Sequence, residues 1–209
     1  MKRGHLIVLE GIDGTGKSTQ TKRLGVWMES LGHTVVLSRE PTDGPYGSKL
    51  RASAATGRLS IQEELGLFLK DRRDHVETLI APNLADGRSV ILDRYYFSTM
   101  AYQGARGLDP VEIRHTNEAF APQPDLLLIL DIDVDVSHQR IGLRGDAVNE
   151  FEQKETLERC REIFLALKDE PFARVIDASR TLDEVSQSIR EEVSRFLARV
   201  ERNETSTEP

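Results

Sequence analysis

The chain has 209 residues, of which 38% are hydrophobic and 30% are charged, and its formal net charge at pH 7 is −7. This length and composition fit one globular α/β domain that can bury a core. The negative balance argues against DNA or RNA as the main partner, because nucleic-acid binding rests on a basic surface. The longest apolar run, Leu126 to Leu130, is too short to cross a bilayer, so we expect no membrane partner.

The N-terminal residues lack the features of a secretory signal, because Met1 to His5 lead directly into an apolar run of strand length. We therefore expect a cytoplasmic protein. The lone cysteine, Cys160, excludes an intrachain disulfide and a cysteine-based zinc site. It shares helical spacing with Leu157 and Phe164, which predicts a buried apolar residue.

Short apolar runs alternate with amphipathic stretches along the chain. Strands are predicted at 5–9, 34–37, 89–92, 126–130 and 173–176. Helical periodicity covers 17–31, 62–86, 95–121, 134–168 and 182–200, and we expect the longer stretches to be broken into two. Continuous apolar runs are typical of strands buried on both faces. The alternation therefore predicts a five-stranded parallel sheet covered by helices on both faces.

The elements form no repeat and leave no linker, so we predict a single domain over residues 1–200. Thr181 and Glu184 are spaced as a capping box at the start of its last helix. Residues 201–209 are polar and are predicted to form a disordered tail.

The strongest motif is a glycine-rich loop of the pattern G-x-x-x-x-G-K-[ST], which runs from Gly11 to Ser18. It lies between the first predicted strand and the first helix, so that its N–H groups and the helix N-terminus can bind the phosphates of ATP. Lys17 is expected to reach the β- and γ-phosphates, and Ser18 to ligate Mg²⁺. The predicted phosphate-binding residues are Gly11, Ile12, Asp13, Gly14, Thr15, Gly16, Lys17, Ser18 and Thr19.

Three classes of protein share this loop: nucleotide switches, ATP-driven machines and small-molecule kinases. The sequence contains no N-K-x-D motif, which guanine-binding switches carry. A machine of the RecA or AAA type usually needs a longer chain. The pattern therefore favours a compact kinase, and the strand–loop–helix context argues against a glycine-rich turn that binds nothing.

A second acidic element follows the third predicted strand. Asp93 ends an apolar run in the manner of a Walker-B carboxylate and is expected to hold Mg²⁺ or its water beside the phosphates. Arg94 comes next and is well placed to bridge the donor and acceptor phosphates during transfer. An ordinary ion pair at a strand end is the structural alternative for these two residues.

An arginine interrupts the apolar stripe of the helix predicted around residues 61–80. The stripe consists of Ile61, Leu65, Phe68, Arg72, Val76 and Leu79. Because burial of an unpaired arginine is costly, Arg72 either reaches the surface, pairs with a core carboxylate or binds a ligand. In the last case Phe68 would stack on a nucleobase, and Arg72 would donate hydrogen bonds to the edge of that base.

Together these residues resemble thymidylate kinases over about residues 5–197. The resemblance rests on Glu10 to Thr19, Arg39-Glu40-Pro41, Leu67-Phe68 with Arg72, Asp93-Arg94-Tyr95 with Ser98-Thr99, Ala101 to Gly104, Pro124-Asp125-Leu126 and Leu130-Asp131. It implies the P-loop NTPase fold with a small lid at 140–151, the cofactors ATP and Mg²⁺, and a homodimer. The implied reaction is ATP + dTMP → ADP + dTDP.

The resemblance also implies roles on the acceptor side. Asp13 is similar to the carboxylate that contacts the 3′-hydroxyl of dTMP, and Arg51 to the arginine that holds its phosphate. Thymine is expected to stack on Phe68 and to receive hydrogen bonds from Arg72, and Arg94 is expected to clamp both phosphates. The remaining acceptor residues are Glu40 and Pro41 as pocket lining, Thr99 and Gln103 as readers of the pyrimidine, and Tyr102 as the group that disfavours a ribose 2′-hydroxyl.

The sequence departs from the family pattern at two places. Pro41 is followed by Thr42 to Pro45 where the family usually has Gly-Gly-Thr, so both dTMP and dUMP stay open as acceptors. In the predicted lid, Glu150 occupies the usual place of an arginine. Arg140 and Arg144 remain as candidate catalytic residues of the lid, and solvated helix-face charges are the alternative for both.

Two other functions remain open at this point. One is phosphorylation of a deoxynucleoside, which Arg51 argues against. The other is a regulatory module that binds nucleotide without transferring phosphate, which the intact Lys17, Ser18, Asp93 and Arg94 argue against. The histidines show no metal-ligand spacing and receive no role, and His75 is expected to be a surface or packing residue.

Overall fold

The computed structural model describes residues 3–56, 59–142 and 150–205, and its centre is a five-stranded parallel sheet. The strands are β1 (Leu6–Glu10), β2 (Val35–Arg39), β3 (Ser89–Asp93), β4 (Leu126–Asp131) and β5 (Ala173–Asp177). They lie in the order β2-β3-β1-β4-β5, and each neighbouring pair is parallel. The predicted sheet is therefore confirmed, with each strand within one or two residues of its expected ends.

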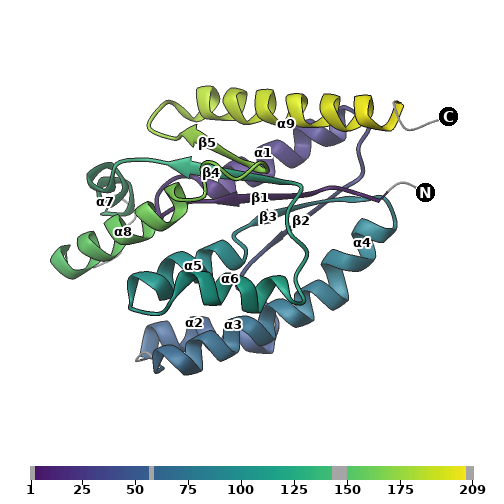
Figure 1. Cartoon of the computed structure of the whole chain (residues 1–209). Coiled ribbons are helices and arrows are strands. Elements are labelled where there is room, and N and C mark those ends of the chain that lie inside the picture. Colours follow the sequence, from purple (N-terminus) through teal and green to yellow (C-terminus); the bar gives the residue numbers. More distant parts are fainter. Residues whose placement is uncertain (1–2, 57–58, 143–149, 206–209) are drawn as a thin grey trace.

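Helices cover both faces of this sheet (Figure 1). Helices α1 (Lys17–Ser30) and α9 (Leu182–Thr205) lie side by side on one face. The other helical elements are α2 (Pro45–Thr56), α3 (Ile61–His75), the π-helical turn η1 (Val76–Ile80), α4 (Ala81–Ala85), α5 (Tyr96–Ala105), α6 (Pro110–Glu118), α7 (Val134–Gly142) and α8 (Glu150–Leu165). On the second face, α5 packs between α3 and α8. No described helix is long and apolar enough to cross a membrane.

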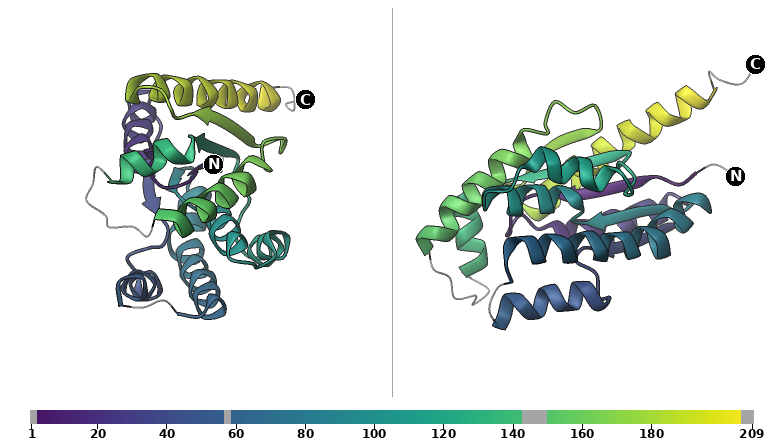
Figure 2. Two further views of the ribbon diagram at one scale, coloured as in Figure 1. Left: turned by 90° about the vertical axis from the view of Figure 1, so that its left-hand side faces the viewer. Right: turned by 60° about the horizontal axis from the view of Figure 1, so that its bottom comes forward.

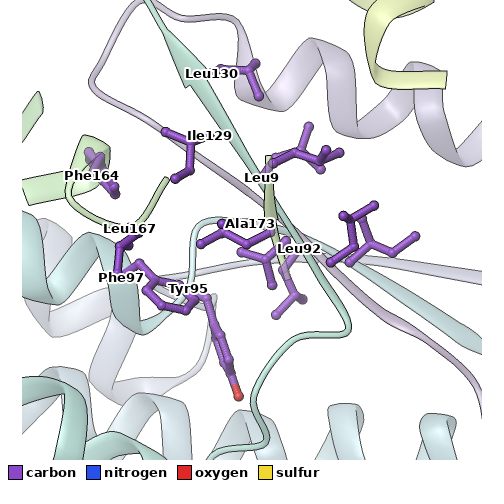
Figure 3. Close-up of a cluster of buried hydrophobic side chains, with 14 of the residues drawn as sticks. Leu9, Leu92, Tyr95, Phe97, Ile129, Leu130, Phe164, Leu167 and Ala173 are labelled. Atoms are coloured by element: carbon purple, nitrogen blue, oxygen red, sulfur yellow. The ribbon is translucent and has the colours of Figure 1, made fainter. Parts of the chain in front are cut away.

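The core is the sheet itself and the side chains packed on it. Strands β1 and β3 are buried along their whole length, as expected for strands covered on both faces. Figure 3 shows part of this cluster, which includes Leu9, Leu92 and Ile129 of the central strands and Phe164 of α8. Cys160 is fully buried in the same helix, which confirms its predicted place in an apolar stripe.

The structure adds one helix to the predicted elements and divides the longer stretches as expected. Helix α2 is not predicted, because its segment carries little apolar periodicity. The stretch 95–121 is divided between α5 and α6 and the stretch 134–168 between α7 and α8, while 62–86 is interrupted by a π-helical turn at Val76–Ile80. The capping box of Thr181 and Glu184 is present.

The strand register brings the candidate site together. Leu9 is level with Asp93, and Arg39 of β2 is also level with Asp93. The segments that follow β1, β2 and β3 therefore leave the same edge of the sheet, which is where parallel α/β proteins bind ligands. In Figure 1 and in the right-hand view of Figure 2, the strands end at this edge, which lies on the same side of the molecule as α7 and α8.

Gly47 marks a close contact between α2 and the segment after β2. A Cβ atom on Gly47 would lie 2.0 Å from the carbonyl oxygen of Thr42 and 2.9 Å from Asp71 Oδ1. We expect Gly47→Ala to lower the free energy of unfolding by about 1–3 kcal/mol, because the backbone of this segment must move. Gly66→Ala in α3 is the matched control, since its Cβ would meet no atom within 4 Å.

The control variant should raise the free energy of unfolding by about 0.5–1 kcal/mol, because alanine is the better helix former. Urea unfolding followed by circular dichroism measures both changes. Equal effects of the two substitutions would show that the contact between Gly47 and Thr42 does not constrain the fold.

Candidate active site

The glycine-rich loop joins β1 to α1 and turns through left-handed backbone conformations. Gly11 and Gly14 have φ angles of 139° and 80°, where side chains are disfavoured. A Cβ on Gly11 would also lie 2.3 Å from the carbonyl oxygen of Leu130 in β4. No side chain caps the N-terminus of α1, and its first turn contains no acidic residue. The positive end of this helix is therefore available to an anion.

Lys17 and Ser18 are the first residues of α1 and point into the site. Lys17 Nζ donates to the carbonyl oxygens of Gly11 at 2.9 Å and Ile12 at 2.8 Å. Burial lowers the pKa of Lys17 to about 7. Ser18 Oγ donates to Asp93 Oδ2, and the other carboxylate oxygen of Asp93 is buried and finds no hydrogen-bond partner among the described residues. This set of oxygens is suited to a hard divalent cation.

Arg94 connects the end of β3 to the glycine-rich loop. Its guanidinium forms an ion pair with Asp13 and lies 5.3 Å from the ring centroid of Tyr102. The hydroxyl of Tyr102 donates to Asp13 Oδ2 at 3.0 Å. Asp93 and Arg94 therefore do not pair with each other among the described contacts. Asp93 contacts Ser18 at the start of α1, and Arg94 contacts Asp13 of the loop, which argues against a simple ion pair at the strand end.

The buried guanidinium of Arg72 is surrounded by polar partners from three other segments. Arg72 is 1% exposed. Its Nε donates to Glu40 Oε2 at 2.8 Å, its Nη2 to Thr99 Oγ1 at 3.1 Å and its Nη1 to Asn117 Oδ1 at 2.5 Å. The guanidinium also lies 5.5 Å from the ring centroid of Tyr95. Of the three expected alternatives, pairing with a core carboxylate is therefore confirmed and surface exposure is wrong, while binding of a ligand by the paired arginine stays a prediction.

His75 is part of the same network, a role that its position in the sequence does not indicate. It is buried, and its Nδ1 lies 3.0 Å from Glu40 Oε1 while its Nε2 lies 2.8 Å from Ser38 Oγ. Glu40 thus contacts Arg72 with one carboxylate oxygen and His75 with the other. The only available signal was the spacing of Arg72 and His75, three residues apart on one helix. Their shared partner is distant in sequence.

Helix α5 carries candidate residues toward both parts of the site. Thr99 contacts Arg72, whereas Tyr102 contacts Asp13 of the glycine-rich loop. Gln103 Nε2 lies 3.4 Å from Glu64 Oε2, and Glu64 also pairs with Arg106. These contacts link the phosphate-binding loop to α3 through one rigid element.

The loop after Pro41 is held by ion pairs and by Asp71. Asp71 accepts hydrogen bonds from Thr42 N at 2.8 Å and Thr42 Oγ1 at 2.6 Å. Arg51 donates to the carbonyl oxygen of Pro41 at 2.9 Å and pairs with Asp43 at 3.0 Å. The Thr-Asp sequence that departs from the family pattern is therefore an ordered part of the site, and it brings Arg51 next to the Glu40–Pro41 segment.

The remaining predicted site residues are Phe68 on α3 and the arginines of the predicted lid. Phe68 is half-buried on α3, one turn before Arg72. Arg140 of α7 donates to the carbonyl oxygens of Ala178 at 3.0 Å and Gly14 at 3.4 Å, so it reaches the glycine-rich loop and is not a fully solvated charge. Arg144 and Glu150, with most of the predicted lid, lie outside the residues whose side chains are described.

A parallel sheet with this loop at its carboxyl edge, a serine–aspartate pair and a neighbouring arginine define a P-loop kinase of small molecules. The family model of thymidylate kinases matches residues 9–189, and the chain belongs to the thymidylate kinase family. It is 56% identical over 182 residues to the thymidylate kinase of Xanthomonas euvesicatoria pv. vesicatoria, which covers 87% of this chain and 80% of that protein.

Other relatives show similar identity over more of the chain. The thymidylate kinase of Xanthomonas campestris pv. campestris is 54% identical over 195 residues, covering 93% of this chain and 85% of the relative. That of Akkermansia muciniphila is 52% identical over 193 residues, covering 92% and 93% respectively. The family expected from the motifs is thereby confirmed.

The Arg72 network predicts a large difference between two adjacent arginines. Arg72→Ala leaves Glu40 buried without its ion-pair partner, and we expect the free energy of unfolding to fall by about 3–5 kcal/mol. Arg73→Ala is the control, because Arg73 is exposed and contacts the ring of Phe120 at 4.2 Å. Its loss should cost less than about 1 kcal/mol. Denaturant unfolding that gave equal losses would contradict the network.

Proposed function

We propose that this thymidylate kinase transfers the γ-phosphate of ATP directly to the phosphate of dTMP, giving ADP and dTDP. The observation that carries the proposal is the pair of contacts made by α5. Thr99 holds the buried arginine of the acceptor side, and Tyr102 holds Asp13 of the phosphate-binding loop. One helix thus fixes a base-binding group and a phosphate-binding loop relative to each other, which is the alignment that direct transfer requires.

On the donor side, the residues of the loop from Gly11 to Thr19 bind the phosphates of ATP. When phosphate enters, Lys17 exchanges the carbonyl oxygens of its own loop for the β- and γ-phosphate oxygens. Arg94 lies between the loop and α5 and neutralises charge on the transferring group. No general base is needed, because the acceptor phosphate is already an anion. Arg140, and Arg144 beyond the described side chains, are further candidates for charge neutralisation.

Ser18 and Asp93 fit a magnesium ion. The Ser18 hydroxyl and the two oxygens of Asp93 provide hard oxygen ligands, and one of those carboxylate oxygens has no hydrogen-bond partner among the described residues. Oxygen ligands next to phosphates are the usual environment of Mg²⁺ in kinases. When bound there, the ion would neutralise phosphate charge and orient the phosphate chain.

On the acceptor side, each residue has a role that its chemistry permits. Thymine stacks on Phe68, and Arg72 donates to its edge from a position fixed by Glu40. Arg51 holds the acceptor phosphate beside Pro41. The other proposed contacts are Thr99 and Gln103 to the pyrimidine, Asp13 to the 3′-hydroxyl, and Tyr102 against a 2′-hydroxyl.

A panel assay tests the reaction and its rivals. Incubation with Mg·ATP and single nucleosides or monophosphates should release ADP with dTMP, and release only with nucleosides would overturn the acceptor assignment. A larger rate with dUMP than with dTMP would show that the altered loop has changed the base preference.

Lys17→Ala should lower kcat at least 100-fold, because it removes a preorganised charge from the transferring phosphates. Lys22→Ala, an exposed site on the same helix, is the control.

The magnesium proposal is tested by a carboxylate substitution. Asp93→Asn should raise the Mg²⁺ concentration needed for half-maximal activity by about tenfold, as expected when a group that holds the metal or its water is weakened. Asp86→Asn, at the exposed end of α4, should leave this concentration unchanged. A magnesium titration of ADP release measures both, and identical titration curves would remove Asp93 from the metal site.

Two further expectations remain predictions: the homodimer implied by the resemblance, and the cytoplasmic location expected from the N-terminal residues. Light scattering of the purified chain checks the first, and cell fractionation checks the second.

A further inference from the structure

Glu10 is a buried acid that neither the motif nor the proposed mechanism uses. It ends β1, is 0% exposed and precedes the glycine-rich loop. Its Oε1 accepts hydrogen bonds from the backbone N–H groups of Tyr95 at 2.7 Å and Ser98 at 3.0 Å. Its Oε2 accepts from the hydroxyl of Ser98 at 2.6 Å. All of these donors belong to the start of α5, on a different part of the chain.

Glu10 therefore replaces the missing cap of α5. The N-cap residue Tyr95 makes no side-chain cap, and the first turn of α5 contains no acidic residue. A carboxylate from a neighbouring strand supplies the negative charge and the acceptors that a helix N-terminus requires. The beginning of α5 is thus anchored to the end of β1, at the base of the phosphate-binding loop.

Ser98 extends this anchor to Arg94. The Ser98 hydroxyl donates to Glu10 Oε2, which accepts as a carboxylate oxygen. Its oxygen then accepts from Arg94 Nη1 at 3.0 Å. Burial raises the pKa of Glu10 to about 7, so the experiment below is set at pH 8, above that value.

Arg94 requires such support because its backbone is strained. Its φ angle is 71°, and among the described residues it is the single non-glycine residue with a positive φ. Such a conformation costs about 1–3 kcal/mol and persists only where neighbouring groups impose it. The imposed contacts are the bond from Arg94 N to the carbonyl oxygen of Leu9 at 3.0 Å and the bond from Nη1 to Ser98.

We propose that Glu10 and Ser98 are positioning residues that hold the Arg94 guanidinium in place for phosphoryl transfer. The proposal rests on the proposed function of Arg94. Neither residue needs to touch a substrate: Glu10 aligns Ser98, and Ser98 aligns Arg94. Asp13 binds the guanidinium on its other side, so two acids of the β1–loop segment orient one arginine from β3.

A double-mutant cycle on the full chain tests this inference. At pH 8 with Mg·ATP and dTMP, Ser98→Ala should lower kcat about tenfold and change both KM values less than about twofold. The reason is that a misplaced Arg94 stabilises the transition state less well but leaves the binding of both substrates nearly unchanged. In an Arg94→Ala background, Ser98→Ala should lower kcat less than about twofold, because the residue through which it acts is gone. Glu10→Gln should show the same dependence on Arg94.

Conservative and control variants complete the experiment. Ser98→Thr keeps the hydroxyl and should recover most of kcat, and Ser188→Ala on α9 removes a distant helix hydroxyl as a control. If Ser98→Ala does not fold, Ser98→Cys carries the same cycle. An equal loss of kcat in both backgrounds, or no loss in the native background, overturns the inference. If Arg94→Ala alone keeps full kcat, the proposed function of Arg94 fails first, and the positioning role fails with it.

Discussion

The parallel pairing of β1 with β3 is the constraint on which the site depends. It sets Leu9 level with Asp93, so the loop that follows one strand and the arginine that follows the other leave the sheet together. Both strands are fully buried, and a slip in their register would disrupt the packing of apolar side chains on both faces and separate these segments. The hydrophobic core therefore supplies the alignment, and the charged residues at its edge supply the chemistry.

Acidic partners hold the arginines of the site in an acidic protein. Glu40 pairs with Arg72 in the interior, Asp13 pairs with Arg94, and Asp43 pairs with Arg51. For Arg72, the ion pair with Glu40 offsets the free-energy cost of burying the charge. For Arg94 and Arg51, this cost is smaller because their ion pairs are partly exposed to solvent. A net charge of −7 is thus compatible with binding anionic nucleotides, because Lys17, Arg94 and Arg51 form a local group of cations at the site.

The sequence was sufficient for the sheet and for the residues in local motifs, and insufficient for their distant partners. Continuous apolar runs identify buried strands, and the spacing from Gly11 to Ser18 identifies the loop, since both signals are local. Helix α2 could not be predicted because its sequence carries little apolar periodicity, and in the structure it packs against α3. Asn117 and His75 were missed because each gains its role only when Arg72 or Glu40 approaches from elsewhere in the chain.

The π-helical turn between α3 and α4 sets the phase of a long helical segment. Arg72, Val76, Ile80 and Leu84 are all buried although they are spaced four residues apart, a spacing that drifts around a regular helix of 3.6 residues per turn. The wider turn absorbs part of this drift. Deleting one residue from 76–80 would bring Arg72 and Leu84 to a separation of about three full turns of an ordinary helix, so both would still face inward. The π-helical turn therefore accommodates one extra residue without turning α4 away from α3.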